Sequence, residues 1–143
     1  MDDGLLCEPL FEDRRLAVMA ATHPLASRPS LTPDELAAEP FVWVREIDPV
    51  TGAFWTLERY RAGNPLLVGA HITGFEDMFP ALRAGQAVAA IPESVAVGLP
   101  WPDIVVREVV GLEPATVALC RRADDSRAIV EAFAAVVRAT PQA

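Results

Sequence analysis

The sequence contains no lysine, so arginine is its only strongly basic residue. Its 12 basic residues are outnumbered by 20 Asp and Glu, which gives a formal net charge of -8 and a pI of about 4.7. Binding to nucleic acid over an extended surface needs a cationic face, because phosphate neutralisation supplies most of the non-specific affinity. The charge balance therefore argues against a nucleic-acid partner for this chain by itself.

Long apolar runs are also missing. Apolar runs such as residues 16–21 and 87–91 stop far short of the roughly 20 residues that span a bilayer. The amino terminus does not combine a basic start with an apolar stretch and a small-residue cleavage site. The sequence predicts a cytoplasmic protein with no membrane partner.

Cysteine and histidine are scarce, with two residues of each. Cys7 and Cys120 lie near opposite ends of the chain and form no C-x-x-C pair, so we expect two reduced, largely buried thiols. His23 and His71 belong to no recognisable catalytic motif. Because these four residues lack the short paired spacings of zinc sites, we expect no metal.

Enzyme chemistry has no clear carrier in the sequence. No serine lies inside a G-x-S-x-G motif, and the glycines form neither a dinucleotide fingerprint nor a phosphate loop. Adjacent carboxylates such as Glu76 and Asp77 are typical of solvated surfaces and helix starts, where the helix dipole favours negative charge. We therefore expect no catalytic residues and no cofactor, and a protein that is not an enzyme.

The composition is sufficient for a packed core, with 52% hydrophobic and 22% charged residues over a length of 143. No repeat, low-complexity tract or linker is visible, so we expect one uninterrupted folded unit. Segments typical of strands alternate with segments typical of helices. The expected strands cover residues 10–21, 41–44, 66–70, 87–91, 104–110 and 115–120. This alternation predicts the α/β class, with a mixed, mainly parallel sheet flanked by helices.

Helix starts and stops lie between these strands. Thr32 and Glu35 have the spacing of a capping box, as do Thr73 and Glu76. A further helix should begin near residue 49 and end at Gly63, and the last should begin near residue 125.

Two strand-to-helix turns, at residues 45–52 and 71–75, are the best candidates for a binding site. In a parallel sheet both would lie at the carboxyl ends of neighbouring strands, where open α/β folds bind small ligands. Each turn would offer free backbone N–H groups to a carboxylate or phosphate, and Arg45 would add a bidentate donor. The alternative is that Arg45 pairs with Glu46 or Asp48 and that the caps serve only their helices.

The order of the segments along the chain carries further information. The informative segments are Leu10-Phe11, Leu16-Ala17-Val18, His23-Pro24-Leu25-Ala26, Glu39-Pro40-Phe41-Val42, Arg45-Glu46, Pro49, residues 84–94, Arg107, residues 117–122 and the helix through Phe133. Their joint order and spacing resemble the second lobe of the effector domains of LysR-type transcriptional regulators. Ala87 departs from the family pattern, which has a second glycine at this position.

This resemblance implies one lobe of a fold like that of type 2 periplasmic binding proteins. The second lobe would cover about residues 16–110, the crossover strands about 9–15 and 115–121, and a carboxyl-terminal helix about 125–139. Most of the first lobe and the DNA-binding winged helix-turn-helix have no counterpart in these 143 residues. The chain would therefore be a partial effector-binding domain.

The resemblance also implies a function. A small anionic metabolite, a carboxylate, would bind between the lobes and shift the full regulator between DNA-bound arrangements. The ligand-binding residues would be Arg45, Glu46, Thr51, Gly52, Thr73 and Phe75. The alternatives are a lobe of a solute-binding protein and a lobe of an enzyme with the same architecture.

The last helix predicts self-association. Its apolar stripe consists of Ala128, Ile129, Ala132, Phe133, Val136 and Val137. Without the first lobe this stripe would be an exposed apolar patch, which favours a homo-oligomer.

Overall fold

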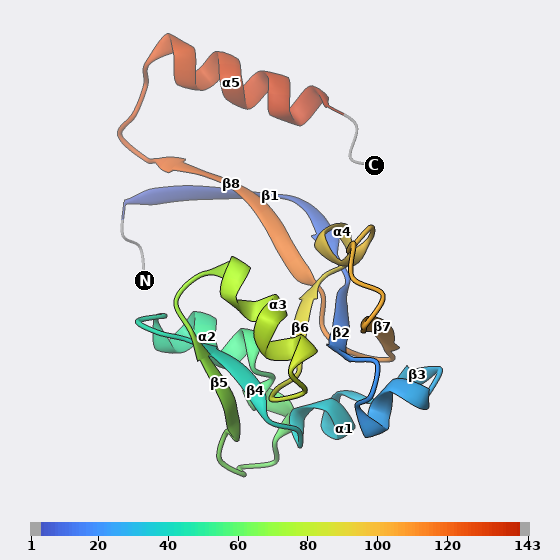
Figure 1. Cartoon of the computed structure of the whole chain (residues 1–143). Helices are drawn as coiled ribbons and strands as arrows, with labels where there is room; N and C mark the ends of the chain where they lie inside the picture. The colour runs from blue at the N-terminus through green and yellow to red at the C-terminus, as the bar shows by residue number, and fades with distance from the viewer. Residues whose placement is uncertain (1–3, 141–143) are drawn as a thin grey trace. The chain divides into compact units, whose positions relative to one another are not determined.

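The computed structural model describes residues 4–140, and the chain divides into two compact units (Figure 1). Residues Arg14–Glu113 form the first, here called the α/β unit, and the segments before and after it form the second, here called the terminal unit. The prediction of one uninterrupted unit is wrong, because the two ends of the chain pair with each other in a sheet of their own.

The α/β unit contains six strands: β2 (Arg15–Ala20), β3 (Ser30–Leu31), β4 (Phe41–Val44), β5 (Val68–Ile72), β6 (Ala89–Pro92) and β7 (Ile104–Val109). They form a four-stranded sheet in the order β3-β7-β2-β6 and a two-stranded sheet of β4 and β5. β2 pairs antiparallel with both β6 and β7, whereas β3 runs parallel to β7 and β4 parallel to β5. A parallel bridge between Phe41 and Val88 joins β4 to the residues that lead into β6. The predicted α/β class is confirmed, but the strands are not mainly parallel, because the central strand β2 runs antiparallel to both of its neighbours.

β2 supplies the centre of the core and is buried along its whole length. Successive side chains of a strand point to opposite faces of a sheet, so β2 contributes to two apolar clusters. Ala17 and Met19 pack in one cluster, and Leu16 and Val18 pack in the other. The predicted strand over residues 10–21 is thus two strands, which separate at Arg14: β1 (Leu5–Asp13) lies in the terminal unit.

The helical segments of the α/β unit are short. They are η1 (Pro24–Ser27), α1 (Pro33–Ala37), α2 (Pro49–Trp55), η2 (Glu58–Tyr60), α3 (Phe75–Arg83) and α4 (Glu93–Ala96). The capping box at α1 is confirmed, since the carboxylate of Glu35 accepts the N–H of Thr32 at 2.8 Å and the Thr32 side chain caps in return. The helix predicted to reach Gly63 ends at Trp55 instead. Leu57 adopts a left-handed backbone with φ of 58°, which cannot continue a right-handed helix, and its side chain is buried.

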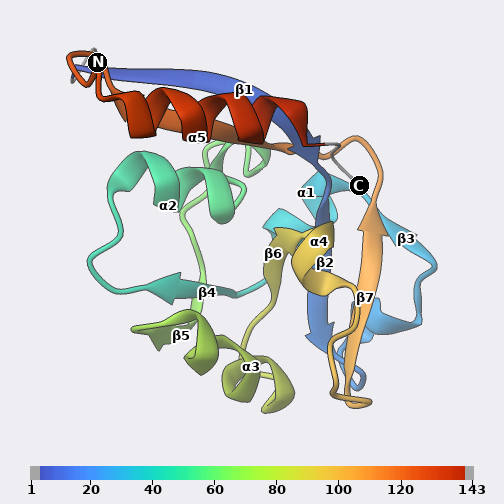
Figure 2. The ribbon, with the colours of Figure 1, turned by 90° about the horizontal axis from the view of Figure 1, so that it is seen from above.

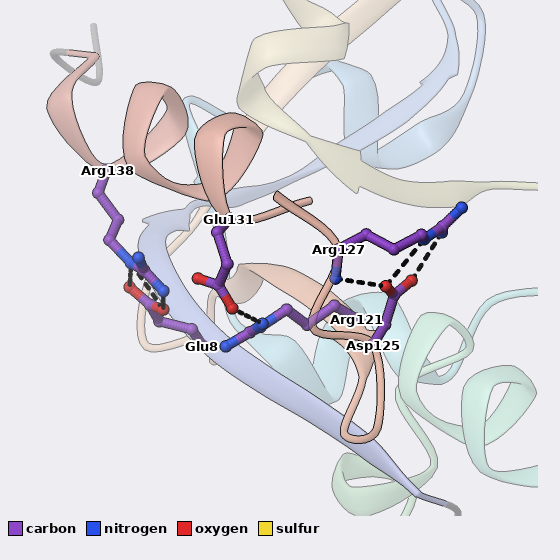
Figure 3. Close-up of polar contacts among 6 residues, drawn as sticks. All are labelled: Glu8, Arg121, Asp125, Arg127, Glu131 and Arg138. Atoms are coloured by element: carbon purple, nitrogen blue, oxygen red, sulfur yellow. Dashed lines mark hydrogen bonds and ion pairs between the residues drawn. The ribbon is translucent and has the colours of Figure 1, made fainter. Parts of the chain in front are cut away.

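The terminal unit consists of a two-stranded antiparallel ladder and one helix (Figure 2). β1 pairs with β8 (Ala115–Arg122), and α5 (Ala128–Ala139) follows. Side chains of α5 bind the ladder through ion pairs. The Arg138 guanidinium donates to the Glu8 carboxylate at 2.7 to 2.9 Å, and Glu131 pairs with Arg121 (Figure 3). α5 is therefore tied to both strands.

The cysteines do not behave as predicted. Cys7 lies directly opposite Cys120 in the ladder, the structure joins their sulfur atoms in a disulfide, and both residues are exposed. The expectation of two buried, reduced thiols is wrong, because antiparallel pairing of the two chain ends brings together residues that are 113 positions apart.

The apolar residues of α5 lie on two faces. Ala134 is buried, whereas Ile129, Phe133 and Val136 are 71%, 60% and 64% exposed. These three residues follow the i, i+4, i+7 spacing of one helical stripe. No helix among residues 4–140 is long and apolar enough to cross a membrane.

Candidate ligand-binding site

A pocket of about 480 Å³ lies in the α/β unit, at the carboxyl ends of β4 and β5. Its wall includes Trp43 from β4, Trp55 from α2 and Phe75 from the first turn of α3. Residues of β6 and α4 also line it: Ala89, Ala90, Ile91, Pro92 and Val95. The surface is mainly apolar and aromatic, which is typical of sites for small organic ligands.

The two turns predicted to form the site do lie side by side. β4 and β5 are parallel neighbours with Val44 opposite Ile72, and the N–H of Arg45 donates to the carbonyl of Ile72 at 2.8 Å. The parallel arrangement therefore brings the segments that follow both strands to one edge of the sheet, as Figure 1 shows. This part of the prediction is confirmed.

The six predicted ligand residues fall into two groups. Gly52, Thr73 and Phe75 line the pocket. Arg45, Glu46 and Thr51 do not line the pocket. Arg45 and Glu46 nevertheless lie next to it, in the loop between the lining residues Val44 and Ile47. Glu46 has a positive φ of 61°, which marks a sharp turn at this point.

Gly52 lets α2 approach the pocket wall closely. A Cβ atom at this position would lie 2.8 Å from the Trp43 ring and 3.2 Å from the side chain of Ile47. Both of these side chains line the pocket. The glycine therefore sets how closely α2 packs against Trp43, and with it the shape of the wall.

The start of α3 is capped differently from the prediction. Helix α3 begins one residue later than the Thr73–Glu76 box requires, with Gly74 as its N-cap residue. The carboxylate of Asp77 accepts the N–H of Thr73 at 3.1 Å, the Thr73 hydroxyl at 2.6 Å and the N–H of Gly74 at 3.2 Å. These hydrogen bonds, above all that from the Thr73 side chain, lower the pKa of Asp77.

The start of α2 is also capped by a carboxylate of the chain. Asp48 accepts the N–H of Thr51 at 2.9 Å, and hydrogen bonds from Thr51 lower the pKa of Asp48. The backbone donors of Thr51, Thr73 and Gly74 are therefore occupied, so the prediction of free N–H groups is wrong for these three residues. The physical reason is that an aspartate at or near a helix start satisfies the same unpaired donors that would otherwise bind an external anion.

Aromatic residues supply the part of the site that the sequence did not single out. Trp43, Ile47, Trp55 and Met78 line the pocket but were not among the predicted ligand residues. Phe75 contacts Phe79 edge to face, and Phe79 stacks on Trp101 with ring centroids 4.5 Å apart, so the rim is continuous with the core. The available signal was the position of two of the three tryptophans, which bracket the loop that contains Arg45.

None of the residues that line the pocket has a charged side chain. Across residues 4–140, no group of three or more His, Cys, Asp or Glu residues could hold a metal ion. The arrangement can enclose the apolar or aromatic body of a small molecule. A charged substituent of that molecule would have to reach the rim.

Comparisons with known proteins agree with this architecture. The family model described as the LysR substrate binding domain matches residues 1–142. The HTH-type transcriptional regulator MetR of Salmonella typhimurium is 32% identical over 136 residues, which cover 91% of this chain and 41% of MetR. The chain thus spans about two fifths of the length of this relative.

Solved structures share the fold at low sequence identity. The BenM effector-binding domain with its effector benzoate has a TM-score of 0.77 at 12% identity, covering 97% of this chain and 64% of that one. The effector-binding domain of QuiR in complex with shikimate has a TM-score of 0.73 at 14% identity, covering 96% and 66%. From the family match over almost the whole sequence, we conclude that the chain belongs to the LysR substrate-binding domain family.

Proposed function

We propose that this chain is the effector-sensing part of a LysR-type transcriptional regulator and that its pocket receives a small carboxylate with an apolar or aromatic body. The α/β unit would be the second lobe, and β1, β8 and α5 would be the two crossover strands and the carboxyl-terminal helix. In the full regulator, effector binding would modulate transcription, and the protein would act in the cytoplasm, where the DNA is. The proposal rests chiefly on one observation, the aromatic pocket at the carboxyl ends of the parallel strands β4 and β5.

The pocket lining supports an apolar or aromatic body for the effector. Trp43, Trp55 and Phe75 present flat apolar surfaces, and rings prefer offset or edge-to-face contacts with such partners. The solved relatives that carry benzoate and shikimate each bind a carboxylate on a six-membered ring. We therefore propose a ring carboxylate for this site.

The carboxylate would bind at the rim of the pocket. The N–H groups of Thr51, Thr73 and Gly74 are already held by Asp48 and Asp77. Arg45 lies in the rim loop between two lining residues, and its guanidinium can donate two parallel hydrogen bonds to a carboxylate. Arg45 is therefore the proposed anion-binding residue.

Isothermal titration calorimetry with benzoate, shikimate and the neutral analogue benzamide tests this proposal. We expect a ring carboxylate to bind more tightly than benzamide, because benzamide offers the guanidinium no charged acceptor. Arg45→Ala should weaken carboxylate binding about tenfold to a hundredfold, the usual value of a charge-assisted hydrogen bond, and should leave benzamide binding unchanged. The intrinsic fluorescence of Trp43 and Trp55 provides an independent readout of occupancy.

Arg59→Ala is the matched control, because Arg59 is an exposed arginine of the same unit outside this pocket and pairs with Glu113 at 3.2 Å. It should leave carboxylate binding unchanged. Equal losses in the two variants, or an Arg45→Ala variant that binds like the parent, would refute the role of Arg45. Failure of every ring carboxylate to bind or to change the fluorescence would refute the proposed ligand class.

A further inference from the structure

The terminal unit carries a pair of cysteines that the pocket does not use. Cys7 in β1 lies directly opposite Cys120 in β8, and their Cα atoms are 4.1 Å apart. Directly opposed residues of an antiparallel ladder point to the same face, and such a short Cα distance is that of a pair without mutual backbone hydrogen bonds. The register of the ladder therefore holds the two sulfur atoms together.

Both cysteines are exposed. Their neighbours Glu8 and Arg121 bind Arg138 and Glu131 of α5 (Figure 3). Because side chains alternate along a strand, Cys7 and Cys120 point to the opposite face of the ladder. A small thiol reagent can reach an exposed pair of this kind.

We propose that Cys7 and Cys120 form a thiol-exchange site, a reversible disulfide that closes and opens with low-molecular-weight thiols and disulfides of the glutathione type. Thiols in the cytoplasm are kept reduced, and the disulfides found there are mostly transient, catalytic or redox-sensing. Exposed disulfides are also more easily reduced than buried structural ones. The inference rests on the cytoplasmic location within the proposed function, but not on the identity of the effector.

The chemistry balances with a disulfide R–S–S–R as oxidant. The thiolate of one cysteine attacks a sulfur of R–S–S–R, which forms a mixed disulfide and releases one R–S⁻. The second cysteine thiolate then displaces the other R–S⁻ and closes the bond between Cys7 and Cys120. In total two protein thiols are oxidised, one R–S–S–R is reduced, and two R–SH are produced after protonation.

Closure would fasten the outer part of β1. The ladder register shifts between Pro9 and Phe11. This bulge separates the outer part of β1, residues 5–8, from its inner part, which ends at Asp13. The exposed ion pair between Glu8 and Arg138 connects this outer part of β1 to α5. Opening the disulfide would therefore let residues 5–8 separate more readily from residues 119–122.

The test treats the chain under native conditions with oxidised glutathione and then with dithiothreitol. Free thiols are counted by maleimide labelling and mass spectrometry, and amide hydrogen exchange is followed in residues 5–8 and 119–122. Cys7→Ser and Cys120→Ser are the matched variants, because each keeps one thiol at the same site but cannot form the internal bond.

The parent should lose both free thiols without retaining a glutathione adduct, to the same extent at every protein concentration, and should recover both in dithiothreitol without denaturant. Each serine variant should retain the adduct, and amide exchange in the outer residues should be slower in the closed parent than in the open one. Stable adducts or linked dimers in the parent, a bond reducible only after unfolding, or identical exchange in the two states would overturn the proposal. None of these readouts depends on effector binding, so a failure here is distinct from a failure of the proposed function.

Discussion

Replacing Arg15 by methionine should destabilise the α/β unit far more than the same replacement at its neighbour Arg14. Arg15 is 3% exposed at the start of β2, and its guanidinium donates to the carbonyl of Glu113 at 2.7 Å and to the carbonyl of Phe54 at 2.6 Å. It also lies over the Phe54 ring, 3.8 Å from the centroid. Burial lowers the pKa of Arg15, a sign that the protein has displaced water from this charge.

The expected magnitude follows from what methionine restores and what it removes. Hydrogen bonds from a charged donor contribute about 1.5–3 kcal/mol each, and a carbonyl left buried without a partner costs about 1–3 kcal/mol. Against this, methionine avoids the desolvation of a guanidinium and still packs against the Phe54 ring. We expect a net loss of about 2–4 kcal/mol in the free energy of unfolding for Arg15→Met.

Urea unfolding followed by tryptophan fluorescence measures this loss directly, because Trp43, Trp55 and Trp101 all lie in the α/β unit. Arg14→Met is the control: the Arg14 side chain is 59% exposed, and its ion pairs with Glu93 and Glu108 lie at the surface, where such pairs contribute little. Arg15→Lys, which keeps the charge but not the planar fork, should fall between the parent and Arg15→Met. If Arg15→Met unfolds at the same urea concentration as the parent, or if Arg14→Met is equally destabilised, the reasoning is refuted.

Three further predictions concern other parts of the chain. A Cβ atom at Gly69 would lie 2.0 Å from the Gln86 carbonyl oxygen, so Gly69→Ala should lower the free energy of unfolding in urea by about 3 kcal/mol or more. At Gly63 a Cβ atom would meet nothing within 4 Å, so Gly63→Ala should cost only about 1 kcal/mol for its left-handed backbone, and similar losses in the two variants would contradict the clash at Gly69. Asp77→Ala should lower the stability of the α/β unit at neutral pH. Because folding lowers the pKa of Asp77, the difference in unfolding free energy between parent and variant should shrink as the pH falls through that lowered pKa, and a constant difference across an acid titration would show that the carboxylate is not the cause. Ile129→Ser combined with Phe133→Ser should reduce self-association measured by light scattering at several concentrations, while Val50→Ser, an exposed residue of the α/β unit, should not; a parent that stays monomeric throughout would remove the basis for an oligomer driven by α5.

Local sequence signals predicted several elements closely. The strand expected over residues 41–44 is β4, and the capping box of Thr32 and Glu35 begins α1 as expected. These features depend on neighbours within a few residues, such as Pro33 at the first helical position and Pro40 before the strand. The adjacency of the turns after β4 and β5 also followed, because parallel strands place their carboxyl ends at one edge.

Other features of the site depend on contacts that no local pattern contains. The Thr73–Glu76 spacing predicted one cap, but Asp77 provides another because its carboxylate reaches Thr73 and Gly74 together. Trp55, the last residue of α2, lines the pocket, and Leu57 just beyond it turns the chain in the left-handed region. Neither result could be obtained from residue spacing. A cap that starts at Thr73 and one that starts at Gly74 differ by a single position, and a positive φ at a leucine has no sequence signature.

By itself, the sequence determined the α/β class, the alternation of elements and the family, because hydrophobic periodicity and the order of segments are properties of the chain. The tertiary structure alone decided which strands run antiparallel, which N–H groups Asp48 and Asp77 cap, and that Cys7 lies opposite Cys120. The physical reason is distance along the chain. Propensities and caps act over a few residues, whereas strand direction, a pocket wall and a pairing across 113 positions depend on which distant surfaces bury each other.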